Sequence, residues 1–261
     1  MIISELIDAI QSGNIRLFLI SFLYSFLALI PALILHELGH GYVALLCGDR
    51  TAKVNGRLSI NPAAHLDPIG TLCMFLIGFG WAKPVPVNPL NFRSRRRDMI
   101  FVSLAGICVN LILSLLSIVI SAILACVVVR DAVGAITVPS FYRSELIRSI
   151  VNGSIYYDSE IFRAAWLMYV TRFFYIFAIY NLTLAVFNFL PIPPLDGYRF
   201  WNTLVFKGRL QLDQRVIFAL ILSLFIINRF TGLLDTVLDS ATTFLLNGVT
   251  DLVLLLFGIG G

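Results

Sequence analysis

The strongest constraint on the fold of this chain is a series of long apolar stretches that recurs along its whole length. Of its 261 residues, 59% are hydrophobic and 13% are charged, and the mean hydropathy is +0.90. A water-soluble domain has about a quarter of its residues charged, whereas about 20 consecutive apolar residues suffice for a helix to cross a bilayer. The sequence therefore predicts an all-α polytopic membrane protein that forms one integral domain over residues 1–261.

The apolar stretches give the order of the membrane segments. We expect helices over about 17–47, 99–129 and 162–190, then a short amphipathic stretch from Leu195 and a C-terminal helical pair over about 216–257. Pro31 lies inside the first stretch, so this helix is expected to be tilted or kinked. The mixed-charge connection from Arg130 to about Glu160 is expected to lie outside the membrane.

A shorter apolar segment, at about 69–81, is predicted to be re-entrant. It has too few residues to span comfortably, and it contains three glycines. Basic residues flank it at 50–57 and at 83–97, and basic residues near spans are retained on the cytoplasmic side. A spanning segment would place these two clusters on opposite sides. We therefore expect it to enter and leave on the cytoplasmic side and to line a cavity, because irregular backbone in a membrane needs protein or water as a partner.

The net charge of +4 is less informative than its distribution. The basic run at 93–97, Arg-Ser-Arg-Arg-Arg, is interpreted as a topology determinant that contacts the lipid surface, and no nucleic-acid partner is expected. The cysteines form no CxxC pair and are expected to be buried free thiols; they are Cys47, Cys73, Cys108 and Cys126.

The motif HELGH at 36–40 lies in the C-terminal half of the first apolar stretch. His36 and His40 are spaced i, i+4, so on a helix both imidazoles project from one face and can bind one metal ion. Glu37 beside them can take a proton from the attacking water and deliver it to the leaving amine, as in HExxH hydrolases. The alternative is a pair of hydrogen-bonded core histidines. Such residues are costly inside an apolar helix unless they form a functional site.

A catalytic zinc site has three protein ligands, so the two histidines require a third. Asp196, in NFLPIPPLDGYR at 188–199, is the best candidate because it follows the third long apolar stretch. Prolines stiffen the chain before it, and Gly197 permits a close backbone approach. The alternative for Asp196 is an ordinary helix N-cap after a proline turn.

HExxH in one membrane helix and NxxPxxxLDG in a later one resemble the site-2 protease family of intramembrane zinc metalloproteases. The segments NPAAHLDPIGT at 61–71 and GWAKPVPVNP at 80–89 are similar to those of its compact bacterial branch, which has no PDZ or CBS domain. The resemblance covers roughly residues 30–205. It implies a core of three helices around one zinc per chain, with His36, His40 and Asp196 as ligands and Glu37 as the catalytic residue. It also implies that the zinc lies near the cytosolic face.

Three further candidates follow from the resemblance. Asn110, in LAGICVN, matches the asparagine of a GPxxN-like motif that could polarise the scissile carbonyl or hold an oxyanion, although Ile107 replaces the usual proline. The alternative is an asparagine that bonds between helices. Gly78, Phe79 and Gly80 resemble an element that pairs with unwound substrate; a simple loop is the alternative. His65 could be a fourth ligand or a substrate contact, and a loop histidine bonded to backbone is favoured.

The expected function is hydrolysis of peptide bonds in or near transmembrane segments of membrane proteins. Its partners would be a transmembrane substrate and the lipid bilayer, and the expected location is the inner membrane of a bacterium with the active site toward the cytoplasm. The alternatives are a membrane metal-binding transporter, which would be expected to show repeated halves, and an inactive protease-like binding protein, against which the intact Glu37 argues.

Overall fold

The computed structural model describes most of the chain, namely residues 10–11, 13–77, 80–133, 146–147, 149–151, 165–210, 212–213, 215–217, 219–220, 223, 228 and 231–256. These residues form helices and connections with no strand among them. Four of the helices are long and apolar enough to cross a membrane: Phe18–Leu46, Arg95–Val129, Trp166–Phe189 and Thr236–Leu256. The prediction of an all-α polytopic membrane protein is confirmed.

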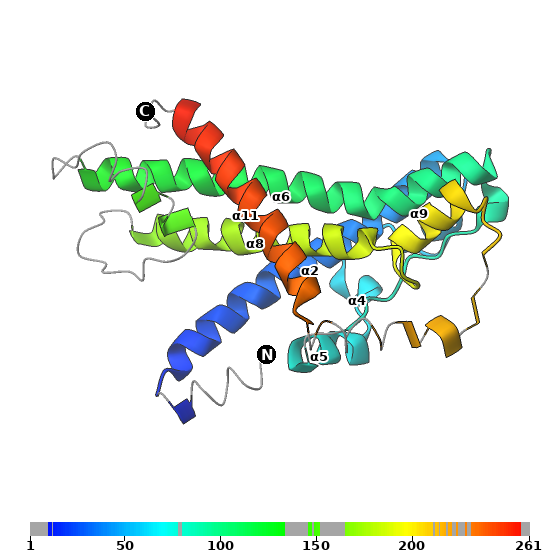
Figure 1. The fold of residues 1–261 in the computed structure, drawn as a ribbon, viewed down its shortest axis with the longest axis horizontal. Coiled ribbons are helices and arrows are strands. Elements are labelled where there is room, and N and C mark those ends of the chain that lie inside the picture. Colours follow the sequence, from blue (N-terminus) through cyan, green and yellow to red (C-terminus); the bar gives the residue numbers. More distant parts are fainter. Residues whose placement is uncertain are drawn as a thin grey trace. The chain divides into compact units, whose positions relative to one another are not determined.

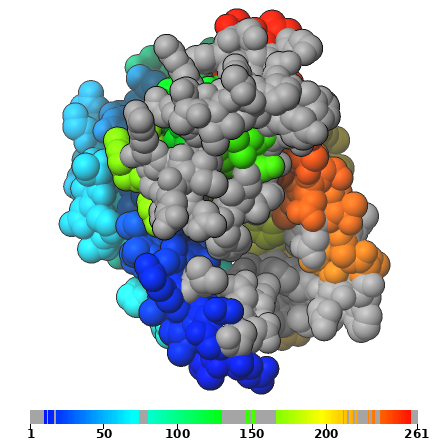
Figure 2. All heavy atoms as spheres, turned by 90° about the vertical axis from the view of Figure 1, so that its left-hand side faces the viewer, coloured from blue at the N-terminus to red at the C-terminus, as the bar shows by residue number. Residues whose placement is uncertain are grey.

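The first long helix, α2 (Ile15–Leu46), continues through Pro31. Its N-terminal half presents large apolar side chains outward, and Leu19 and Leu23 are each 56% exposed. This part of α2 (blue) lies on the surface that Figure 2 shows. Side chains in its C-terminal half are buried more often, and Ala32 and Ala44 are completely buried. The change from an exposed to a buried helix places the HELGH motif in the packed half.

Short elements follow α2: α3 (Thr51–Val54), α4 (Pro62–His65), α5 (Pro68–Ile77) and the 3₁₀ turn η1 (Pro89–Asn91). The side chains of Asn61 and Asn88 cap α4 and η1, and a proline follows each cap. The two ends of the segment predicted to be re-entrant lie side by side, because Leu66 and Ala82 form an antiparallel bridge. A segment that enters and leaves on one side requires such an arrangement, and the re-entrant topology stays a prediction.

The remaining helices are α6 (Arg95–Val133), α8 (Ala165–Phe189), α9 (Asp196–Val205) and α11 (Leu233–Leu256). The start of α6 lies four residues before the predicted Met99, since the Asp98 carboxylate accepts a hydrogen bond of 2.8 Å from the Ser94 amide and stabilises the first turn. The amphipathic stretch expected from Leu195 is α9. Of the predicted C-terminal pair, α11 is the second member, and most of residues 216–227 lie outside the described residues.

The chain divides into two compact units, Met1–Asn110 with Leu184–Gly232, and Leu111–Thr183 with Leu233–Gly261. The helices α6 and α8 each contribute to both. In the first unit α9 packs beside the start of α6 (Figure 1), where the Arg96 guanidinium donates to the carbonyls of Thr203 and Leu204 at 3.3 and 3.0 Å. The second unit has an apolar core around Ile118, Ile147 and Met168. All the candidate site residues belong to the first unit.

Candidate metal centre

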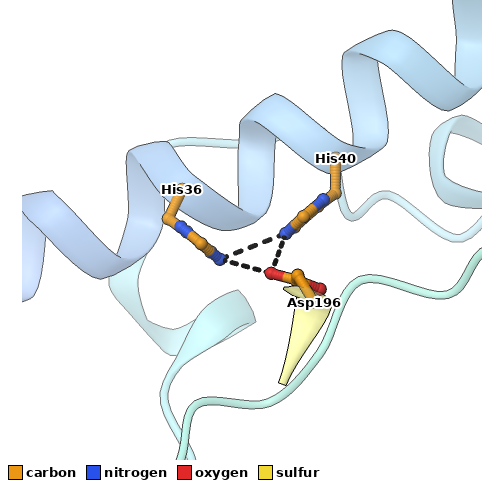
Figure 3. A group of neighbouring side chains, drawn as sticks. All are labelled: His36, His40 and Asp196. Atoms are coloured by element: carbon orange, nitrogen blue, oxygen red, sulfur yellow. Dashed lines mark hydrogen bonds and ion pairs between the residues drawn. The ribbon is translucent and has the colours of Figure 1, made fainter. Parts of the chain in front are cut away.

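His36 and His40 project from adjacent turns of α2 toward Asp196, as Figure 3 shows. The spacing of four residues places both imidazoles on one face of the helix. Both are buried, with 5% and 7% of their surfaces exposed, and their Nε2 atoms are 3.1 Å apart. The helical arrangement that the motif predicts is therefore present.

Asp196 is the first residue of α9, and its Oδ2 atom lies 3.0 Å from Nε2 of His36 and 2.9 Å from Nε2 of His40. Leu195 occupies the N-cap position of α9, so the carboxylate of Asp196 does not cap that helix. Gly197 makes the tight approach possible, because a Cβ there would collide with the backbone of Phe189. The loop before α9 thus brings a carboxylate, 160 residues away in sequence, onto the histidine face of α2.

The outer nitrogen of each imidazole is engaged by an acceptor. Nδ1 of His40 donates to the carbonyl of Val102 at 2.7 Å, and Nδ1 of His36 donates to Oδ1 of Asn110 at 2.5 Å. A neutral imidazole carries one proton, so these bonds hold the protons on Nδ1 and leave the lone pairs on Nε2. Both lone pairs face the carboxylate of Asp196.

This donor set fits a zinc ion. Two imidazole nitrogens and a carboxylate oxygen form a triangle with edges of 2.9–3.1 Å, and a tetrahedral zinc with ligands about 2.0–2.1 Å away has ligand atoms about 3.3 Å apart. Three lone-pair-bearing atoms at such short separations repel one another unless a cation lies among them. Two histidines and one carboxylate also leave a fourth position for water or substrate.

The closeness of α6 to the histidines depends on Gly106. A Cβ at this position would lie 2.6 Å from Nε2 of both His36 and His40, and real side chains do not approach so closely. Gly39, between the two histidines, faces α6 in the same way, with Ala105 and Val109 around it. The pair of glycines therefore lets α6 pack directly against the site.

Glu37 faces a different neighbour, the extended segment that precedes η1. The backbone amide of Val85 donates a hydrogen bond of 2.8 Å to Oε2 of Glu37. Gly41, one turn further along α2, makes room for this segment, because a Cβ there would lie 3.2 Å from the Val85 side chain. Pro84 and Pro86 have no amide proton, so Val85 supplies the one amide in this tripeptide.

Asp49 anchors the same segment from the end of α2. Its buried carboxylate accepts hydrogen bonds from the Asn88 amide at 2.7 Å, from the Asn91 side chain at 2.8 Å and from Thr51. Burial alone would raise the pKa of Asp49, but these bonds outweigh it and lower the pKa below its ordinary value. The carboxylate is therefore charged at neutral pH and holds residues 88–91 against the helix.

Asp196 is ionised as well. Burial alone would raise the pKa of its carboxyl, but protons shared with His36 and His40 lower the pKa below its ordinary value. A zinc ion among the three ligand atoms would replace those protons and favour the same charged form of Asp196. An anionic oxygen and two neutral imidazoles form the ligand set that zinc hydrolases use.

The other candidates are placed differently. Asn110 is completely buried, with Oδ1 on His36 and Nδ2 donating to the Ala32 carbonyl at 3.4 Å. His65 lies outside the triangle of ligand atoms and donates from Nε2 to the Ser59 carbonyl at 2.6 Å. Gly80 belongs to an irregular connection, and Gly78 and Phe79 lie outside the described residues.

Val85, Gly106 and Asp49 were not singled out in the sequence. The signals for the first two are present in hindsight: Val85 stands between two prolines, and Gly106 lies four residues before Asn110 in LAGICVN. Asp49 offers no such signal, because an aspartate after a helix is ordinary.

The chain is similar to known proteins over most of its length. The sequence profile of peptidase family M50 matches residues 24–228. A protein of Bacillus subtilis (strain 168) with the name "Putative zinc metalloprotease YwhC" is 37% identical over an alignment of 195 residues that covers 72% of this chain and 75% of that protein. No solved structure matches the chain. The range matched by the profile contains His36, Glu37, His40 and Asp196.

Proposed function

The chain belongs to peptidase family M50, the site-2 protease family, and from this premise we propose that His36, His40 and Asp196 bind the catalytic zinc while Glu37 is the acid and base. The family and the four apolar helices make the protein an integral membrane zinc metallopeptidase. Neither a metal transporter nor an inactive binding protein is favoured by this membership.

One observation carries the assignment of the site. Nε2 of His36, Nε2 of His40 and Oδ2 of Asp196 converge within 3.1 Å of one another, while Nδ1 of each imidazole lies within hydrogen-bond distance of an acceptor on the far side of its ring. A core histidine pair would direct at least one proton toward its neighbour. A carboxylate facing two lone pairs is the arrangement of a metal site.

Zinc, when bound, supplies a Lewis acid that lowers the pKa of water and polarises the scissile carbonyl. Glu37 performs the proton transfers. The Val85 amide fixes Oε2 of this carboxylate, and Oε1 takes the proton of the attacking water and delivers it to the leaving amine. Asn110 orients His36 through Nδ1 and thereby acts as a positioning residue, and Val102 does the same for His40.

A membrane-embedded protease of this family acts on membrane proteins within the lipid bilayer. We extend this to peptide bonds in or near transmembrane segments, with residues 78–80 as the substrate contact and His65 as a packing residue of the adjacent loop. The active site is proposed to face the cytoplasm at the inner membrane of a bacterium. This orientation is supported by the arginines and lysines at 50–57 and 83–97, which follow the end of α2 that carries the histidines.

The ligand assignment is tested by zinc analysis of the purified full-length protein. We expect about one zinc per chain in the wild type and a large loss in His36→Ala, His40→Ala and Asp196→Ala. His65→Ala is the matched control, because it removes the remaining histidine without touching the triangle of ligand atoms. Full zinc occupancy in Asp196→Ala together with a loss of zinc in His65→Ala would mean that His65, and not Asp196, is the third ligand.

The proposed orientation is tested by cysteine labelling from each side of the membrane, in a variant without native cysteines. Single cysteines at residues 53 and 95 should both be labelled from the cytoplasmic side. Labelling of these positions from opposite sides would show that the segment between them spans the membrane.

A further inference from the structure

Two hollows on the surface of the first unit meet at Arg93. The first, which we call the apolar groove, has a volume of about 520 Å³ and lies between the end of α2 and the start of α6. The second, the basic hollow, has a volume of about 950 Å³ and lies between the end of α2, α3 and η1. Arg93 lines both hollows, so the two are neighbours on the surface.

The apolar groove lies where α2 ends and α6 begins, at one boundary of both candidate spans. Its walls include Val43, Leu46, Phe101 and Leu104, and Leu46 and Phe101 are 75% and 51% exposed. The carboxylate in its lining, Asp98, is buried and already accepts hydrogen bonds from the Ser94 amide and the Arg97 guanidinium. The groove therefore offers almost only hydrocarbon to a ligand.

The basic hollow has the opposite character. Arg50, Lys53 and Arg93 line it together with Asn91 and apolar residues, and no carboxylate does. Among the described residues, none of these three cations takes part in an ion pair. The nearest acid in the sequence, Asp49, is completely buried and accepts hydrogen bonds from Thr51, Asn88 and Asn91. Three positive charges thus line a hollow that no carboxylate lines.

We propose that this composite site binds one anionic phospholipid, with an acyl chain in the apolar groove and the phosphate of its headgroup in the basic hollow. A membrane lipid is the ligand that joins a hydrocarbon chain to an anion at the level where spans meet the membrane surface. A peptide fits less well, because its amides and carbonyls would remain without hydrogen-bond partners in the groove. The site is separate from the metal centre, and the proposal does not depend on proteolysis.

The test measures lipid retention, not cleavage. The full-length protein in detergent is given phosphatidylglycerol or phosphatidylcholine of equal chain length, and bound lipid is counted by native mass spectrometry. The wild type should retain one phosphatidylglycerol at least tenfold more tightly than phosphatidylcholine. The triple variant Arg50→Gln, Lys53→Gln and Arg93→Gln should lose that preference, since each basic side chain near an anionic headgroup contributes about fivefold to affinity.

Two further variants make the test specific. Arg95→Gln, Arg199→Gln and Arg209→Gln together remove the same charge from exposed positions that do not line either hollow, and this control should keep the wild-type preference. Cys108→Trp fills the apolar groove, where Cys108 is exposed, and should reduce retention of both lipids. Thiol alkylation gives an independent readout, because bound phosphatidylglycerol should slow the reaction of Cys108 in the wild type.

Three results would overturn the proposal. If both triple variants lose the preference for phosphatidylglycerol equally, binding of this lipid depends only on the total surface charge. Equal retention of the two lipids by the wild type would mean that the basic hollow binds no headgroup. The third result is an acidic peptide that displaces phosphatidylglycerol and also slows the alkylation of Cys108 in detergent without lipid. Such a result would show that the site binds a polypeptide.

Discussion

The backbone amide of Val85 donates a hydrogen bond of 2.8 Å to Oε2 of Glu37. The donor comes from an extended segment that Asp49 anchors to the end of α2 and that Gly41 admits close to the helix. The orientation of the Glu37 carboxylate is thus set by a neutral group of the main chain. The following predictions concern the contacts that support the site.

Val85→Pro removes the amide proton while keeping an extended backbone, and Val85→Ala keeps the proton while trimming the side chain. A hydrogen bond to a charged group is worth about 1.5–3 kcal/mol, so kcat should fall about ten- to a hundredfold in Val85→Pro, with zinc content and KM close to wild type. Val85→Ala should retain kcat within a few-fold. Equal losses in both variants would show that the side chain, not the amide, matters.

Gly106→Ala should displace the imidazoles of His36 and His40, because the added Cβ would lie 2.6 Å from Nε2 of each. We expect zinc occupancy well below one per chain by metal analysis. Gly248→Ala is the matched control in α11, where an added Cβ meets nothing within 4 Å. That change should leave zinc unaffected and stabilise the helix by up to about 1 kcal/mol. Full occupancy in Gly106→Ala would mean that α6 can shift away from the histidines.

Two substitutions at Asn110 separate its possible roles. Asn110→Asp keeps an acceptor for Nδ1 of His36 but loses the Nδ2 donor, whereas Asn110→Leu loses both. If Asn110 positions His36, zinc affinity should be retained in the aspartate variant and fall about 10–100-fold in the leucine variant. If Asn110 instead stabilises an oxyanion, both variants should bind zinc normally and both should lose kcat.

Asp49 gives the protein a pH-dependent stability. Its pKa is lowered in the folded state, so its contribution is complete above the ordinary carboxyl pKa of about 3.9 and is lost as the pH falls through the lowered value. Asp49→Asn should cost about 1–3 kcal/mol near pH 7, because donors to the carboxylate lose their acceptor. Thermal midpoints in detergent from pH 7 to pH 3 should converge for the two proteins at the acid end. If the difference between the two thermal midpoints stays constant with pH, the charge of Asp49 does not account for it.

Much of this structure could be predicted because hydropathy and a single motif carry strong physical constraints. The helical spacing of His36 and His40 already places both on one face, and the long apolar stretches correspond to α2, α6 and α8 within a few residues. The start of α6 was placed too late because Arg95–Arg97 are polar, and hydropathy does not report the capping contact between Ser94 and Asp98. Helix geometry, not hydropathy, sets that boundary.

The supporting contacts were harder to predict because they depend on tertiary packing. The backbone amide of Val85 has no side-chain signature in the sequence. Gly106 could equally be an ordinary helix residue, because nothing in the sequence marks its contact with the histidines. The sequence left two roles open for Asn110, a contact with substrate or a hydrogen bond between helices, and its buried amide contacts His36 and Ala32 of α2. The four cysteines were expected to be buried, but only Cys126 is; Cys47 and Cys73 are half-buried, and Cys108 is exposed where it lines the apolar groove. Only the packing of α6 on α2 decides these points.

Zinc bound by His36, His40 and Asp196 is proposed to act together with Glu37. The most direct measurement compares wild type with Glu37→Gln, both reconstituted in vesicles with a panel of single-span membrane proteins, and records zinc content and cleaved product for each. Glutamine keeps the shape and the Val85 contact but cannot shuttle a proton. We predict about one zinc per chain in both proteins, and cleavage that falls at least about a hundredfold in Glu37→Gln. Cleavage by Glu37→Gln at a near wild-type rate would contradict the account.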